Sequence, residues 1–169
     1  MSHCGESTDG YYLTTLCTVD VASGWSECVG VWGKGQERVG GAVHKIRQRL
    51  PFPLLGLDSD NGSEFINQHL YSYCRREGIT FTRSRSYKKN DSCHVEQKNW
   101  SVAVWRLVGY DRYNSRAALE ALNRIYALTR LYVTFFQEVM KLMSKTRQGA
   151  KVHKVCDRAR DVLSTVTSL

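Results

Sequence analysis

The sequence predicts an α/β protein in which three antiparallel strands precede alternating helices and parallel strands. Residues 11–21 (YYLTTLCTVDV) are rich in aromatic and β-branched side chains and follow the turn dipeptide Asp9-Gly10. Between residues 36 and 82, helical and strand patterns alternate along the chain. This order predicts a mixed sheet that is flanked by helices.

The antiparallel part begins with a short strand within residues 1–7, which pairs with residues 11–21. If the turn is centred between Asp9 and Gly10, the numbers of paired residues add up to about 19. Asp20 would then lie opposite a position just upstream of Met1. After Ser23-Gly24, residues 25–32 form the third strand.

The alternating part begins with a helix over residues 36–50, whose apolar side chains recur at helical spacing and which Pro51 ends. Residues 53–60 (PLLGLDSD) form a short apolar run, which is typical of a buried parallel strand. We expect a helix over residues 63–77 and a strand over residues 79–82.

Two long helices are expected next, over residues 92–108 and 116–138. The stretch 141–160 carries seven lysines and arginines, and we expect little fixed structure in it. The predicted organisation is a core over residues 1–113, a C-terminal helix within 114–140 and a basic tail over 141–169.

Composition favours a polyanionic partner. The 169 residues carry a formal net charge of +8, which suits nucleic acid, although a basic surface that only keeps the protein soluble is the alternative. Six cysteines are scattered without any CxxC spacing, so we expect reduced thiols and no zinc site. No apolar run reaches membrane-spanning length and no signal-peptide pattern opens the chain, so a cytoplasmic location is expected.

Two acidic residues stand in conspicuous local patterns. Asp60, in DSDNGSEF (residues 58–65), ends a buried strand, where open α/β sheets bind ligands. Glu96, in HVEQKN (residues 94–99), lies in the first turns of a helix and shares a face with Asn99. Taken alone, Asp60 could belong to a turn that caps a helix, and Glu96 could be an ordinary carboxylate near a helix N-terminus.

Taken together, the two acids are more specific, because 35 residues separate them. The sequence from His3 to Tyr113 resembles the D-D-35-E catalytic core of retroviral-type integrases and of bacterial insertion-sequence transposases. The resemblance implies a ribonuclease-H-like fold and strand cleavage and strand transfer on DNA, with transposon ends and target as partners. It implies a homo-oligomer, associated with the nucleoid when bound to DNA. It assigns catalysis and metal binding to Asp60 and Glu96, with Asn61 and Asn99 in support.

The resemblance also implies the metal chemistry. Two Asp and one Glu would hold two divalent ions, Mg²⁺ or Mn²⁺, for a two-metal mechanism. The first Asp of the family's set lies before the position that matches His3, and no Asp precedes His3 here. We therefore expect an N-terminally truncated core with little or no catalytic activity. Asp20 is expected to be a supporting residue, and Asp58 a structural one.

Two other functions compete with an integrase or transposase core. The chain could be a non-catalytic nucleic-acid-binding remnant of a transposase, which the missing Asp favours. An ordinary ribonuclease-H-like nuclease is disfavoured by the 35-residue spacing and by the DNGSEF pattern.

A basic loop precedes Glu96 in the sequence. We expect this loop, RSRSYKKND (residues 83–91), to contact DNA phosphates rather than to be only a solvated connection. The expected DNA-binding residues are Arg83, Arg85, Lys88, Lys89 and Lys98.

Overall fold

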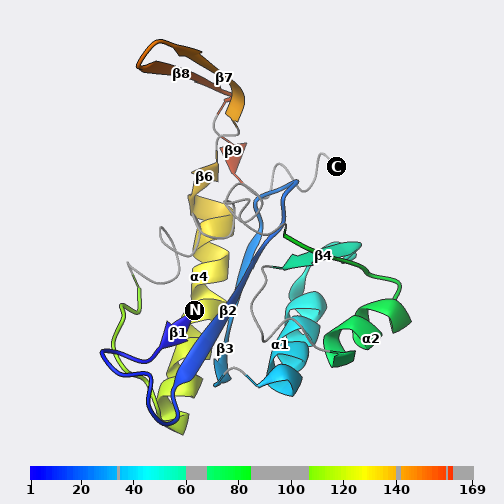
Figure 1. The fold of residues 1–169 in the computed structure, drawn as a ribbon, viewed down its shortest axis with the longest axis vertical. Coiled ribbons are helices and arrows are strands. Elements are labelled where there is room, and N and C mark those ends of the chain that lie inside the picture. Colours follow the sequence, from blue (N-terminus) through cyan, green and yellow to red (C-terminus); the bar gives the residue numbers. More distant parts are fainter. Residues whose placement is uncertain (34, 60–67, 85–106, 140–141, 159, 162–169) are drawn as a thin grey trace.

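A twisted antiparallel sheet lies between helices on both of its faces (Figure 1). The computed structural model describes residues 1–33, 35–59, 68–84, 107–139, 142–158 and 160–161. The sheet comprises β1 (Ser2–His3), β2 (Leu13–Val19) and β3 (Ser26–Trp32), in the order β1-β2-β3. The predicted antiparallel opening of the chain is therefore confirmed.

The register between β1 and β2 differs from the prediction. Ser2 pairs with Thr14 and His3 with Leu13, so paired numbers add up to 16 and not to about 19. The connection is a longer loop than the tight turn assumed from Asp9-Gly10. Arg112 holds this loop, because its guanidinium donates to the backbone oxygens of Cys4 and Ser7 at 3.2 and 2.8 Å and also to that of Asp9.

A second, parallel ladder follows in the chain. It pairs β4 (Gly56–Ser59) with β5 (Thr80–Arg83), from Gly56 opposite Thr80 to Ser59 opposite Arg83. The predicted parallel strands are confirmed. Within the described residues, however, they form a sheet separate from the antiparallel one, whereas the prediction was one continuous mixed sheet.

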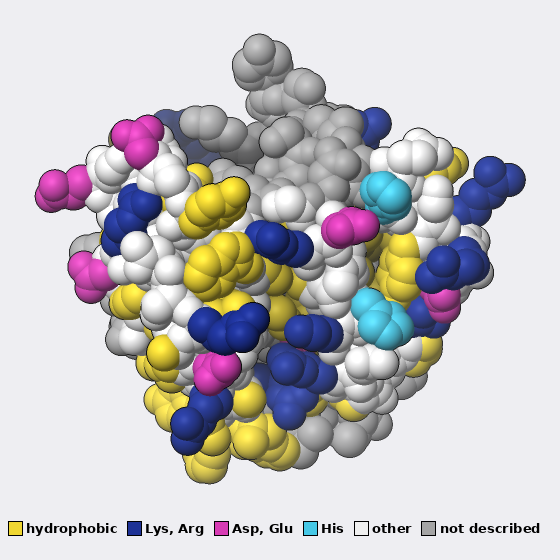
Figure 2. All heavy atoms as spheres, turned by 90° about the horizontal axis from the view of Figure 1, so that it is seen from below, with side chains coloured by type: hydrophobic (Ala, Val, Ile, Leu, Met, Phe, Trp, Pro, Cys, Tyr) yellow, Lys and Arg dark blue, Asp and Glu magenta, His cyan; other side chains and the backbone are white. Residues whose placement is uncertain are grey.

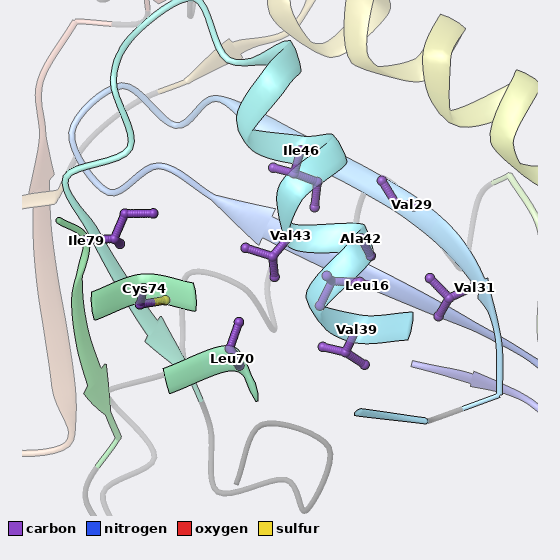
Figure 3. Close-up of a cluster of buried hydrophobic side chains, with 10 residues drawn as sticks. All are labelled: Leu16, Val29, Val31, Val39, Ala42, Val43, Ile46, Leu70, Cys74 and Ile79. Atoms are coloured by element: carbon purple, nitrogen blue, oxygen red, sulfur yellow. The ribbon is translucent and has the colours of Figure 1, made fainter. Parts of the chain in front are cut away.

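The larger hydrophobic core lies between the antiparallel sheet and the helices α1 (Gln36–Arg49) and α2 (Gln68–Arg76). Figure 3 shows the α1 side chains pointing toward those of β2 and β3, with the α2 side chains and Ile79 alongside. Alternation along the strands and the 3.6-residue period of α1 explain why these positions are apolar. The cluster consists of Leu16, Val29, Val31, Val39, Ala42, Val43, Ile46, Leu70, Cys74 and Ile79.

A smaller core joins the sheet to α4 (Arg116–Phe136). Leu13, Val108, Leu122 and Tyr126 are buried there, with partly buried neighbours from β3. The helix begins where the sequence predicts, because the Ser115 hydroxyl accepts a hydrogen bond from the Ala118 N–H at 3.1 Å. No helix in the described part of the chain is long and apolar enough to span a bilayer.

The prediction of little fixed structure after residue 141 is wrong. The chain forms an antiparallel hairpin of β7 (Leu142–Gln148) and β8 (Lys151–Cys156). Below this hairpin, β6 (Glu138–Val139) pairs with β9 (Arg160–Asp161). The basic composition suggested a solvated tail, but Thr146, Val152 and Val155 favour strands and Gly149 allows the turn with its φ of +60°.

Candidate functional site

The C-terminal ends of β4 and β5 meet at one edge of the parallel ladder. Ser59, the last residue of β4, pairs with Arg83, and the Ser84 N–H donates to the Ser59 carbonyl at 2.8 Å. Ser59 is buried, whereas Arg83 is exposed. Asp60 directly follows Ser59 in the sequence, and the basic loop begins at Arg83. The carboxyl ends of parallel strands are where α/β proteins bind ligands, so this edge is the candidate site.

Asp58 is engaged by the neighbouring strand. Its Oδ1 accepts a hydrogen bond from the Thr82 hydroxyl at 2.6 Å, and its Oδ2 accepts one from the Ser84 hydroxyl at 3.2 Å. Both carboxylate oxygens therefore cross-link β4 to β5 at the candidate edge. This arrangement agrees with the prediction that Asp58 is a structural acid.

Asp20 closes the turn between β2 and β3. Its Oδ2 accepts hydrogen bonds from both the N–H and the hydroxyl of Ser23, each at 2.6 Å. Its backbone N–H donates to the Trp25 carbonyl at 2.8 Å, and its carbonyl accepts from the Gly24 N–H at 2.8 Å. The local role of Asp20 is thus to fix a turn, and its supporting role in catalysis stays a prediction.

The other predicted site residues lie outside the described residues. Arg83 and Asp20 are thus the two members of the predicted set that the structure places. The remaining members are Asp60, Asn61, Arg85, Lys88, Lys89, Glu96, Lys98 and Asn99.

A buried acid that the sequence analysis missed connects β3 to α4. The Glu27 side chain is 1% exposed, and its Oε1 accepts a hydrogen bond from the Trp25 indole N–H at 3.1 Å. The same oxygen lies 3.5 Å from Nη1 of Arg130. A buried carboxylate requires such partners, because it loses its hydration. The signal in the sequence was a charged residue inside an otherwise apolar strand, WSECVGVW (residues 25–32).

A second buried network of hydrogen bonds links β1 and β2 to α4. The Thr15 hydroxyl lies 2.7 Å from Nε2 of His3 and 2.7 Å from the Tyr126 hydroxyl. Burial, followed by the nearby amino terminus, lowers the pKa of His3 from 6.5 to about 4. The ring is therefore neutral at pH 7, and it is buried together with Thr15 and Tyr126. These three residues tie the first two strands to the helix that covers them.

A separate cavity of about 740 Å³ lies near the beginnings of β2 and α1. Its lining includes Tyr11, Tyr12, Arg38 and His69. Arg38 is already engaged, because its guanidinium donates to the Trp32 carbonyl. The cavity shares no lining residue with the candidate edge formed by β4 and β5.

Sequence comparison finds a relative that is longer than this chain. No family model matches the chain. It is 45% identical over 154 residues to an uncharacterized protein, y4rM, of Sinorhizobium fredii; the match covers 91% of this chain but 44% of that protein. The chain thus spans less than half the length of this relative.

Chains of two solved structures are similar in fold. The catalytic core domain of BIV integrase has a TM-score of 0.53 at 19% identity, and the match covers 75% of this chain and 84% of that one. A chain of the simian T-cell lymphotropic virus intasome, solved in complex with the PP2A regulatory subunit B56 gamma, has a TM-score of 0.56 at 13% identity. That match covers 82% of this chain and 55% of that chain. The chain therefore has a fold similar to that of an integrase catalytic core.

Proposed function

We propose that this chain is part of a DNA integration or transposition protein, in which Asp60 and Glu96 would be metal-binding acids for the cleavage and joining of DNA strands. One observation carries the proposal: the sequence segment DSDNGSEF begins with the last two residues of β4, in a chain with an integrase-like fold. The pairing of Ser59 with Arg83 also places the start of the basic loop beside the start of that segment.

The chemistry of the acids supports a divalent metal. Carboxylate oxygens are the ligands that Mg²⁺ and Mn²⁺ prefer. Asp58 and Asp20 are already hydrogen-bonded to hydroxyl and N–H groups, which supports assigning the metal to Asp60 and Glu96. When bound, the metal would supply Lewis-acid activation of a hydroxyl and charge stabilisation at the phosphate.

The remaining residues of the edge would position the DNA. Arg83 is exposed where β5 ends, and its positive charge can pair with a phosphate. Arg85, Lys88, Lys89 and Lys98 would extend this contact, and Asn61 and Asn99 would orient the acids. Such contacts hold the phosphodiester in place for in-line attack. A homo-oligomer is part of the proposal, because one of the structures of similar fold comes from a viral intasome.

The decisive experiment measures metal binding and strand transfer separately. Mn²⁺ binding is measured by calorimetry for the unmodified chain, for Asp60→Asn and for Glu96→Gln. Each substitution should weaken binding at least about tenfold, because a lost charged ligand is costly for a hard cation. Glu120→Gln, on an exposed part of α4, is the matched control and should bind Mn²⁺ like the unmodified chain. Equal Mn²⁺ binding by all four proteins would refute the assigned ligands.

Strand transfer is then measured on duplex oligonucleotides with Mg²⁺ or Mn²⁺. Transfer that disappears in Asp60→Asn and persists in Glu120→Gln supports the proposed activity. DNA binding without strand transfer, in either metal, would instead support the alternative of a non-catalytic nucleic-acid-binding protein.

A further inference from the structure

The hairpin of β7 and β8 projects away from the rest of the chain (Figure 1). All residues from 143 to 156 are exposed, so neither face of the hairpin is covered by the described body of the protein. An isolated two-stranded hairpin is marginally stable in water. At its base, the pairing of β6 with β9 joins both ends of the hairpin to the end of α4. The hairpin is therefore an exposed arm, and the β6–β9 pair connects it to the end of α4.

The charge of this arm is of one sign. Residues 142–156 contain no acidic residue and four cations, which are Lys145 and Arg147 before the turn and Lys151 and Lys154 after it. The register sets Lys145 directly opposite Lys154 and Arg147 opposite Val152, so three cations share one face. Among the described residues, none of these three forms an ion pair. Like charges directly opposite each other destabilise a strand pair, so the bare arm contains a repulsion that an anion would relieve.

Arg147 is oriented toward the tip of the arm. Its Nε donates a hydrogen bond to the Gly149 carbonyl at 3.1 Å. No described residue accepts a hydrogen bond from the two terminal nitrogens of the guanidinium, and their spacing suits two oxygens of one phosphate.

We propose that the hairpin Leu142–Cys156 is a β-ribbon arm that lies in a groove of duplex DNA, with Lys145, Arg147 and Lys154 facing phosphates. The major groove of B-DNA is wide enough to admit a two-stranded ribbon. The exposed position of both faces leaves room for the groove walls, and phosphates would neutralise the opposed lysines. The inference rests on the proposed function only in naming DNA as the polyanion.

Net charge alone does not identify the arm as the binding surface. Lys and Arg side chains also gather on the end of the molecule seen in Figure 2, which faces away from the arm. A test must therefore compare the arm with an equal loss of charge elsewhere. Lys45, Arg75 and Arg124 serve this purpose, because they are exposed on α1, α2 and α4.

The experiment measures the affinity of the full chain for a 30-base-pair duplex of arbitrary sequence against salt concentration. Two triple variants are compared with the unmodified chain: Lys145→Gln, Arg147→Gln and Lys154→Gln in the arm, and Lys45→Gln, Arg75→Gln and Arg124→Gln in the control. The arm variant should lower the slope of log affinity against log salt by about 2.7, because each phosphate contact contributes about 0.9. The control should lower it by less than about 1. Equal losses in both variants would overturn the arm as the binding element.

A single-stranded probe of the same length tests the duplex assignment. The arm variant should lose less affinity on single strands than on duplex, since a groove is needed for the ribbon to enter. Equal losses on both probes would refute groove binding. Circular dichroism and thermal melting of both variants exclude unfolding as the cause of a loss.

The outcomes also separate this inference from the proposed function. A lower slope of log affinity against log salt in the arm variant, together with no strand transfer by the unmodified chain, would support DNA binding by the arm and refute the catalytic proposal. Strand transfer by the unmodified chain, together with unchanged DNA affinity in the arm variant, would support the catalytic proposal and refute DNA binding by the arm. No DNA binding by the unmodified chain would refute both.

Discussion

The side-chain amide of Asn123 pairs with both backbone groups of Gly30. The Gly30 N–H donates to Oδ1 of Asn123 at 3.1 Å, and Nδ2 of Asn123 donates to the Gly30 carbonyl at 3.2 Å. Because β3 is the last strand in the sheet, this pair occupies hydrogen-bonding groups at a buried edge. The lack of a side chain at Gly30 lets α4 approach: an added Cβ would lie 3.3 Å from Nδ2 of Asn123 and 3.4 Å from Cδ1 of Leu119.

Asn123→Ala should therefore destabilise the protein by about 1–3 kcal/mol, because it leaves a buried N–H and a buried carbonyl without partners. Urea unfolding followed by circular dichroism measures the change. Glu120→Ala, on an exposed position of the same helix, should change stability by less than about 0.5 kcal/mol. Gly30→Ala should lower the free energy of unfolding less in the Asn123→Ala background than in the unmodified chain, because the amide that the new Cβ would approach is absent there. Additive effects would contradict the close contact.

Tyr126→Phe removes the hydroxyl that lies 2.7 Å from the Thr15 hydroxyl. The expected loss is about 1–2 kcal/mol, because the Thr15 hydroxyl is buried and keeps only His3 as a partner. Tyr132→Phe is the matched control, since Tyr132 lies on the same helix and is 55% exposed. Chemical denaturation of the three proteins provides the comparison, and equal stability of the two variants would contradict a stabilising role for this contact.

Stability should fall between pH 6.5 and pH 4 because of His3. Its pKa is about 4 in the folded chain, compared with 6.5 when solvated, so the unfolded state binds more protons in this window. Protonation therefore favours unfolding as the pH falls, by up to about 3 kcal/mol at the lower end. Above pH 6.5 both states hold a neutral ring and the effect vanishes.

The measurement is the free energy of unfolding against pH for the unmodified chain and for His3→Leu. The difference between the two proteins should shrink as the pH falls from 6.5 to 4. A difference that is constant over this range would show that the histidine is not neutralised by folding.

The described cysteines should differ widely in reactivity. A hydrogen bond with Cys17, whose Sγ is 3.0 Å away, raises the pKa of Cys28 well above its usual range, and burial raises it further. Burial also raises the pKa of Cys74. Since the thiolate is the nucleophile, iodoacetamide at pH 7.5 should label the exposed Cys156 well before Cys28 and Cys74. Peptide mass mapping over time follows the order, and early labelling of Cys28 would contradict it.

The basic loop should make its own contribution to DNA affinity. Replacing Arg83, Arg85, Lys88 and Lys89 with alanine should lower the salt slope by about 3–4, if each contacts one phosphate. Fluorescence anisotropy of a labelled duplex measures the slope. An unchanged slope would exclude the loop from the binding surface and leave the β7–β8 arm as the main candidate.

Local pattern was enough to predict most of the elements. The aromatic and β-branched composition of residues 11–21 and the helical spacing of Val39, Val43 and Ile46 each depend on near neighbours in the chain. Strands and helices appear where these patterns predict them, because burial of one face imposes the period on the sequence. The fold class followed from the order of these elements.

Candidate acids could also be picked out by sequence, since Asp60 and Glu96 stand in specific local patterns at a specific spacing. Their mutual geometry stays a prediction, because both lie outside the described residues. What the structure contributed is the frame of the site: the parallel pairing of Ser59 with Arg83, and the hydrogen bonds that tie Asp58 to β5.

Contacts between distant segments were decided by the tertiary structure alone. Arg112 lies more than a hundred residues away in the sequence and donates hydrogen bonds to the loop that connects β1 to β2. Asn123 pairs with Gly30, and Arg130 approaches Glu27, only because α4 lies against β3. The basic hairpin was not predicted from the sequence, because its high positive charge indicated a solvated tail and few of its residues favour strands. Sequence patterns report which face of an element is buried, whereas the partner of each polar group depends on three-dimensional packing.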